Sequence, residues 1–211
     1  MPANFVGLTM LAPALAVVAE ARRLRAEGAT LIVVAAHVGS SCQDLHDPSD
    51  LSSCEQDEEL FTMAAAIPPG TVDVIVAGHT HAAMAHRVGD IAVIESYSSG
   101  RAFGRVDVRV SARGVVTGIS IHPPRELCPL GDDGAPVAVA ACTGQTYEGQ
   151  PVVPDPTVAA IVDVALRTAR TRGDERLGPT LTAAITRAYG EESALGNLFT
   201  DLMLAAQPSA G

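Results

Sequence analysis

The stretch VIVAGHTHAAM, residues 74 to 84, decides the fold of this chain. Its first five residues are apolar or small and predict a buried strand, and His79 and His81 follow that strand directly. In an extended His-x-His motif the two histidine side chains point the same way, because side chains alternate along a strand. Neutral imidazole is the commonest protein ligand for metal ions, so the motif predicts ligands to one ion or to two neighbouring ions.

A second apolar run, TLIVVAA at residues 30 to 36, ends directly before His37. We expect this run to be a strand that is buried on both faces, with a helix at residues 55–67 between it and the next strand, at residues 72–78. The order strand, helix, strand with a right-handed crossover makes the two strands parallel neighbours. Ligand sites in open α/β sheets lie at the carboxyl ends of the strands. His37 is therefore expected to converge with the His-x-His motif.

Composition narrows the class of protein. The chain has 211 residues, of which 47% are hydrophobic and 3% aromatic, so its core is built from Ala, Val, Leu and Ile, as in α/β proteins. Because its formal charge is −10, we expect it to bind nucleic acid or an anionic membrane poorly. No apolar run reaches the roughly 18 residues of a membrane span, and the first 28 residues lack the pattern of a signal peptide.

Hydrophobic periodicity and turn residues predict the remaining elements. Two hairpins, turning at Gly89-Asp90 and Arg113-Gly114, are expected to extend the edge of the sheet. The other predicted elements are a helix at 13–27, a loop at 123–156, a helix capped by Asp155, a strand at 180–189 and a final helix at 190–206 that starts near Glu191, Glu192 and Ser193.

The four cysteines form two local pairs, Cys42 with Cys54 and Cys128 with Cys142. Neither pair has the CxxC spacing of a zinc knuckle. Two disulfides are expected, each contributing ~3 kcal/mol in the chain-entropy model, and they would imply an oxidising compartment. The alternative is four reduced and unrelated thiols. Without a signal peptide, the chain is either cytosolic or lacks its true N-terminus.

Other polar residues have a simpler interpretation. A lone histidine outside a motif is usually a hydrogen-bonded loop residue, and this is expected for His46, His86 and His122. The loop between the first cysteine pair offers further oxygen ligands in Asp44, Asp47 and Asp50.

These motifs together resemble a known family. VIVAGHTHAAM resembles the last signature of the calcineurin-like metallophosphoesterases, and LIVVAAHVG, residues 31–39, resembles the preceding histidine signature. The closer resemblance is to the 5'-nucleotidase branch, which includes bacterial nucleotidases and 2',3'-cyclic phosphodiesterases. Residues 91–108, 145–162 and 192–203 also resemble segments of that branch, so the resemblance covers almost the whole chain.

The resemblance implies a four-layer α/β/β/α sandwich that holds two divalent metal ions, of unspecified identity, at its strand ends. There, water attacks the phosphate of a nucleotide or another small phosphoester. By motif, His37 and His79 would bind one ion and His81 the other. A sister activity with the same Gly-His-x-His motif is thiosulfohydrolase, and a non-catalytic relic or binding module is the alternative of a different class.

The resemblance also assigns supporting roles. Gly39, Gly78 and Thr80 would shape the loops that carry the histidines. Arg101 and Arg105 follow the segment SYSSG and would lie on the substrate side of the site.

The sequence departs from the family pattern at both ends. It lacks an Asp-x-His, a Gly-Asp with its bridging Asp, and a Gly-Asn-His-[Asp/Glu] motif. The resemblance thus divides the chain into the second half of a catalytic domain at 1–125, a linker at 126–156, and the start of an α+β C-terminal domain at 157–211. We expect the isolated chain to be inactive, to bind at most one ion weakly, and to pair with a chain that supplies the missing half. The full-length protein would be periplasmic or extracellular.

Overall fold

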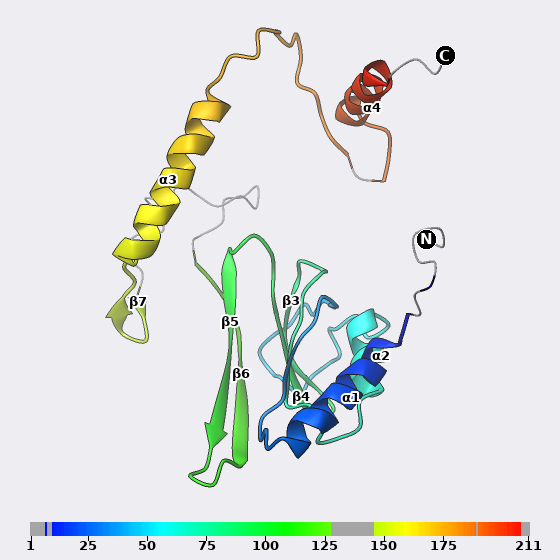
Figure 1. Cartoon of the computed structure of the whole chain (residues 1–211), viewed down its shortest axis with the longest axis vertical. Coiled ribbons are helices and arrows are strands. Elements are labelled where there is room, and N and C mark those ends of the chain that lie inside the picture. Colours follow the sequence, from blue (N-terminus) through cyan, green and yellow to red (C-terminus); the bar gives the residue numbers. More distant parts are fainter. Residues whose placement is uncertain (1–6, 8–9, 128–145, 189, 208–211) are drawn as a thin grey trace. The chain divides into compact units, whose positions relative to one another are not determined.

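A computed structural model describes residue 7 and residues 10–127, 146–188 and 190–207 (Figure 1). The chain divides into two compact units, residues 1–152 and 153–211. The first unit is α/β and contains all six histidines. No helix in the described part of the chain is long and apolar enough to cross a membrane.

The centre of the first unit is a four-stranded sheet with the order β1-β2-β4-β3. Its strands are β1 (Val33–Ala35), β2 (Val74–Val76), β3 (Ala83–Val88) and β4 (Ile91–Ser96). The parallel pairing of β1 with β2 confirms the prediction from the strand-helix-strand order, and β4 pairs parallel with β2. β3 and β4 form the expected antiparallel hairpin around Gly89-Asp90.

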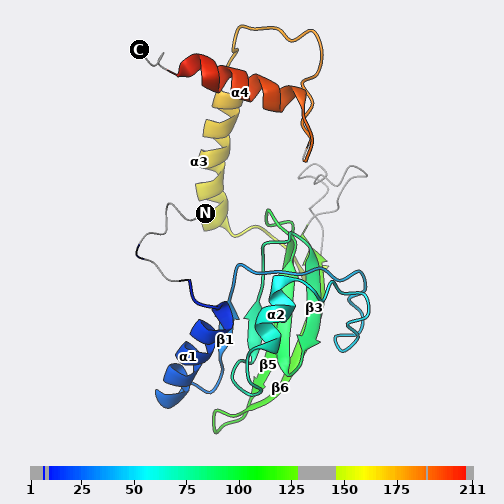
Figure 2. The same cartoon turned by 90° about the vertical axis from the view of Figure 1, so that its right-hand side faces the viewer.

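Helices cover one face of this sheet and a second sheet covers the other, as Figures 1 and 2 show. On the first face lie α1 (Pro13–Ala26) and α2 (Glu59–Ala65), the latter four residues shorter at its start than expected. On the other face lies the antiparallel pair of β5 (Ala102–Val110) and β6 (Val116–Glu126). The expectation that β5 and β6 extend the edge of the first sheet is therefore wrong.

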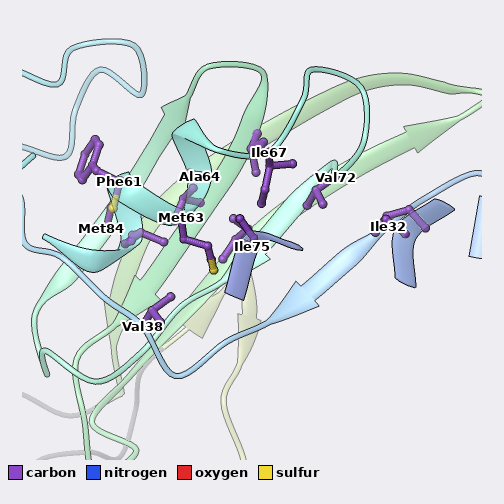
Figure 3. Close-up of a cluster of buried hydrophobic side chains, with 14 of the residues drawn as sticks. Ile32, Val38, Phe61, Met63, Ala64, Ile67, Val72, Ile75 and Met84 are labelled. Atoms are coloured by element: carbon purple, nitrogen blue, oxygen red, sulfur yellow. The ribbon is translucent and has the colours of Figure 1, made fainter. Parts of the chain in front are cut away.

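Alternate residues of the central strands pack against the layers on the two faces of the sheet, because successive side chains of a strand point to opposite sides. One set packs against the helices. It includes Ile75 and Met84, which Figure 3 labels, and also Val93. The residues next to them, Val74, Ala85, Ala92 and Ile94, pack with Ile121 of β6. Apolar residues on both sides of a strand therefore bury the sheet between two layers and leave β5 and β6 packed on its face.

A glycine sets how closely the two sheets approach. A Cβ atom on Gly104 of β5 would lie 2.5 Å from the Cδ1 atom of Ile94 and 2.4 Å from the Oγ atom of Ser96. Both distances are shorter than atoms of this kind tolerate, so only glycine fits where the strands cross.

The edge strand β1 is more exposed than the sequence predicted. Val33 is 52% exposed and Val76 of the neighbouring strand is 46% exposed, so the expectation that the strand is buried on both faces is wrong. The reason is that β5 and β6 pack over β3 and β4. β1 ends the sheet, and no further strand among the described residues pairs with it.

The opposite edge of the sheet is covered by a disulfide-closed loop. The predicted Cys42–Cys54 disulfide is confirmed. The N–H of Cys42 donates to the carbonyl of Ala83 over 3.2 Å, and the N–H of Arg87 donates to that of Pro48 over 2.7 Å. The loop thus satisfies backbone groups of β3 that an edge strand otherwise leaves open. The predicted pair Cys128 and Cys142 lies outside the described residues.

The rest of the described chain is simple. β7 (Thr146–Tyr147) and β8 (Gln150–Pro151) form a short hairpin. The second unit contains α3 (Pro156–Gly173) and α4 (Ala194–Ala206). Asp155 caps α3 as predicted, and Ser193 caps α4. The predicted strand at 180–189 is wrong for its described part, 180–188, which contains no strand.

We predict that Val33→Lys reduces self-association of the chain. An exposed, unpaired apolar strand is a template for pairing with another chain, and a lysine on the edge opposes that pairing. Sedimentation velocity over a range of concentrations measures the effect. The matched control is Val115→Lys, because Val115 is 57% exposed but lies in the β5–β6 turn. Equal self-association of the wild type and Val33→Lys would contradict the prediction.

Candidate metal site

Two histidines meet at the carboxyl ends of β1 and β2. Because these strands are parallel and in register, His37 and His79 leave the sheet at the same edge. The Nδ1 atom of His79 lies 3.1 Å from the Nε2 atom of His37, and the ring centroids are 4.9 Å apart. Both residues are exposed. The structure thus brings these two predicted ligands together, and their metal-binding role stays a prediction.

The distance between the two nitrogens is compatible with a shared cation. Two imidazole nitrogens bound to one ion at about 2.0–2.1 Å lie roughly 3 Å apart when their angle at the ion is between a right angle and a tetrahedral one. The same 3.1 Å also suits an N–H···N hydrogen bond between neutral rings. The residues therefore fit a divalent ion with little movement, and the hydrogen bond holds the pair together without one.

His81 does not lie where it could be a third ligand to an ion shared by His37 and His79. His81 is exposed. Among the described residues, its ring nitrogens form no group with those of His37 and His79 in which all atoms lie within 4.8 Å of one another. This arrangement is compatible with the family resemblance, which assigns His81 to a different ion.

The backbone of the His-x-His motif is unusual. The φ angle is 97° at His79 and 58° at His81. Residues other than glycine seldom adopt positive φ, and such strained positions persist only where the surroundings fix them. The surrounding contacts must therefore hold this loop in place.

The two predicted loop-shaping glycines differ in how much space surrounds them. A Cβ atom on Gly39 would lie 2.5 Å from the carbonyl oxygen of Gly78 and 2.9 Å from the Oγ1 atom of Thr80. A Cβ atom on Gly78 would make only an ordinary contact, at 3.9 Å from the Nδ1 atom of His37. Close packing between the two histidine loops thus requires glycine at position 39.

A buried carboxyl group lies beneath these loops, and sequence reasoning did not single it out. Glu95 of β4 is 1% exposed. Its carboxyl group contacts Thr80 at 2.7 Å and the backbone N–H of Ser40 at 3.3 Å. The available signal was one acidic residue at the end of the apolar run IAVI, where a strand enters the core.

The two predicted substrate-side arginines have different surroundings. The Arg101 guanidinium lies 4.3 Å from the centre of the Tyr97 ring, and its Nε atom is buried without a hydrogen-bond partner. Arg105 pairs with Asp107 and Glu148, and these carboxylates raise the pKa of its guanidinium. Arg101 therefore retains unused hydrogen-bonding capacity, whereas the charge of Arg105 is compensated within the fold.

A second group of candidate ligands lies under the disulfide loop. The side chains of Cys42, Cys54 and His86 bring one ligand atom each to within 4.8 Å of one another. Metal ions bind the cysteine thiolate, and the two sulfurs are bonded to each other here. This group is therefore structural while the disulfide is intact.

The prediction that His86 is a loop residue is wrong. It lies in β3 and is fully buried, because the disulfide loop covers that edge strand. Burial lowers the pKa of its imidazole, and the nearby backbone of Asp44 offsets part of that effect. His46 is an exposed loop residue bonded to Asp44, as predicted. His122 lies in β6 rather than in a loop, and it bonds to Asp107.

The acidic residues of the disulfide loop are used locally. Asp44, Asp47 and Asp50 each accept a hydrogen bond from the backbone N–H two residues further on. Such turns fix the loop, and the contacts give no sign of the carboxylates approaching His37 or His79.

Comparisons with known proteins give a distant relationship. No established family model matches the chain. A cell wall protein of Listeria monocytogenes, Lmo0130, is 25% identical over 188 residues, which cover 84% of this chain and 21% of that protein. A solved Staphylococcus aureus structure, provisionally named a 5'-nucleotidase and in complex with α-ketoglutarate, is 22% identical with a TM-score of 0.41. That match covers 64% of this chain and 26% of the other. The chain thus spans about a fifth to a quarter of each relative.

We predict that buried His86 makes stability sensitive to mild acid. The unfolded chain takes up a proton near pH 6.5, whereas the folded chain, with its lower pKa, takes it up at lower pH. The unfolded state thus binds more protons, and the free energy of unfolding decreases as the pH falls below about 6.5. Urea unfolding of the wild type and His86→Leu at pH 7.5 and 5.5 measures this loss.

The loss should be smaller in His86→Leu, whose buried side chain does not titrate. His46→Leu, which removes an exposed histidine, should behave like the wild type. An equal loss in the wild type and His86→Leu would contradict the prediction.

Proposed function

We propose that this chain carries part of the catalytic site of a metal-dependent phosphoester hydrolase of the 5'-nucleotidase type. The observation that carries the proposal is the 3.1 Å approach of His37 and His79 at the carboxyl ends of two parallel strands. Supporting it are the His-x-His motif after β2 and the resemblance of several segments to that family. The chain spans about a fifth of its Listeria relative, so a complete site would draw on residues beyond those present here.

In this proposal the histidines act as neutral ligands. His37 offers Nε2 and His79 offers Nδ1 to one divalent ion, and His81 reaches a second position. Bound divalent ions would lower the pKa of a coordinated water for attack on phosphorus and would offset charge on the phosphate oxygens. Because each imidazole must be unprotonated to bind, acid weakens the site. The substrate class is a nucleotide or another small phosphoester.

We assign the substrate side of the site to Arg101. It belongs to a loop that begins at Tyr97, whose N–H donates to the carbonyl of Ala82, the residue after His81. Tyr97, on whose ring the guanidinium stacks, is therefore bonded through its backbone to the residue after the His-x-His motif. A planar guanidinium matches the geometry of phosphate oxygens, and stacking on Tyr97 orients it.

The setting we propose is the cell surface or another extracytoplasmic space. The Cys42–Cys54 disulfide is stable in an oxidising compartment, and the Listeria relative is a cell wall protein. We further propose that the open edge of β1 pairs with a strand from the part of the fold that supplies the missing ligands. A layer from that same part would cover the face on which Val33 and Val76 are exposed.

We predict that His37→Ala and His79→Ala each weaken binding of Mn²⁺ or Co²⁺ by at least tenfold. Each variant removes one of two nitrogens that share the ion. Isothermal titration calorimetry at pH 7.5 measures the affinity, and repeating it at pH 5.5 should show weaker binding for the wild type. The control is His46→Ala, an exposed histidine in the disulfide loop.

A wild-type affinity equal to that of the double variant His37→Ala/His79→Ala would contradict the proposed site. Activity is the second measurement. Hydrolysis of p-nitrophenyl phosphate or AMP by the chain alone should be close to background, since a two-metal site needs more ligands than three imidazoles. Turnover at the rate of full-length relatives would contradict that expectation.

We predict that Arg101→Gln lowers the affinity of the Mn²⁺-loaded chain for inorganic phosphate by about tenfold or more, because a charge-assisted hydrogen bond contributes roughly 1.5–3 kcal/mol. Its affinity for Mn²⁺ should not change. Arg105→Gln is the matched control, because Arg105 is already paired with Asp107 and Glu148. An equal loss of phosphate affinity in both variants would contradict the assignment.

A further inference from the structure

The carboxyl group of Glu95 connects the two loops that carry the histidines. It lies near the end of β4, the third strand to end at this edge of the sheet. Its Oε2 atom accepts from the N–H of Ser40 over 3.3 Å, and its Oε1 atom lies 2.7 Å from the Oγ1 atom of Thr80. Ser40 is three residues after His37, and Thr80 lies between His79 and His81.

Thr80 and the backbone complete the connection. The Thr80 hydroxyl lies 3.0 Å from the carbonyl oxygen of Ser40, and the N–H of Gly78 donates to the carbonyl of Val38 over 3.1 Å. A Cβ atom on Gly39 would lie 2.6 Å from the Oε2 atom of Glu95. The two loops are thus bonded to one buried group and are also packed closely against it.

The Thr80 hydroxyl lies near two acceptors, the Ser40 carbonyl and the Glu95 carboxyl group. A threonine hydroxyl has one proton, so Thr80 donates to either the Ser40 carbonyl or Glu95, not to both. A side-chain amide at position 95 would close the ring of bonds. Its N–H would donate to Thr80, Thr80 would donate to Ser40, and its carbonyl would accept from the Ser40 N–H. Glutamine therefore fits this position by shape and by hydrogen bonding.

Charge has no evident role at this position. Glu95 is 1% exposed, and none of the ion pairs found in the described part of the chain includes it. A buried charge without an ionic partner is costly, whereas buried polar groups that are fully hydrogen-bonded are well tolerated. The contacts are those of a group that holds loops in place.

We infer that Glu95 is a positioning residue, which fixes the approach of His37 to His79 through hydrogen bonds to Ser40 and Thr80 rather than through its charge. The inference rests on the proposed function for its consequence in metal binding. The geometric part stands on the metal-free protein. The strained φ angles at His79 and His81 agree with it, because Thr80 between them is held by Glu95.

The test compares Glu95→Gln with Glu95→Ala in the full chain. One measurement is the nuclear Overhauser effect between ring protons of His37 and His79 without metal, and the other is the affinity for Co²⁺. Glu95→Gln should keep the ring contact and bind Co²⁺ within about twofold of the wild type. Glu95→Ala should lose the ring contact and bind at least tenfold more weakly. The control Ile94→Ala, next in sequence and buried on the opposite face, should unfold more easily but keep both signals.

If Glu95→Ala does not fold, Thr80→Val and Thr80→Ser replace it. The first removes the hydroxyl at constant shape and should lose both signals, and the second keeps the hydroxyl and should retain them. Intact signals in Glu95→Ala, or in Thr80→Val, overturn the inference, as does failure of Glu95→Gln to preserve them. A ring contact that depends on Glu95 in a wild-type chain that binds no Co²⁺ supports the positioning role and contradicts the proposed function.

Discussion

Parallel pairing of β1 with β2 is the constraint on which the rest of the structure depends. Each strand is only three residues long, yet their register forces the chain to leave both strands at one edge. The ladder continues beyond the strands through the bond from the N–H of Ala36 to the carbonyl of Val76. Because His37 and His79 follow these two strands within a few residues, their rings lie next to each other. An antiparallel pairing would put them at opposite ends of the ladder.

The covering layers make this short ladder stable. Residues such as Ile75 and Met84 pack under the helices, while Ala85 and Ile94 pack against β6. A strand buried on both faces needs apolar residues at successive positions, which β2 has throughout and β4 has from Ile91 to Ile94. The exposed end of the sheet at β1 shows the limit of that burial, since the second sheet packs mainly over β3 and β4.

Much of the fold could be predicted from the sequence, because the patterns that indicate helices, strands and turns lie within short stretches of the chain. Periodicity predicted α1, the hairpins and the parallel strands, and capping residues predicted the starts of α3 and α4. Apart from the predicted strand at 180–189, the errors concern which elements lie next to each other. No local sequence pattern indicates that β5 packs on a face of the sheet, that His86 lies under a loop, or that Val33 lies at an uncovered edge. These outcomes depend on contacts between residues far apart in the chain, which single-sequence patterns do not encode.

The same limit applies to the candidate site. The His-x-His motif and the strand-terminal His37 were visible because each follows an apolar run. Glu95 and Arg101 were harder to interpret, because their importance comes from what they contact. A carboxyl group in an apolar strand is a weak signal until its partners are known. The structure supplies those partners in Ser40 and Thr80, which belong to two other loops.

Among the described residues, the loop closed by Cys42 and Cys54 covers the β3 edge of the sheet and leaves one open side, at β1. A molecule with one unpaired strand edge can pair with one other molecule, and the resulting dimer has no unpaired edge left. If a thiol reductant cleaved the bond, the loop could detach from Ala83 and Arg87 and leave both sides open. Molecules with two open sides can add to one another without end. The redox state of the buffer during purification would then decide whether this chain forms limited pairs or open-ended polymers.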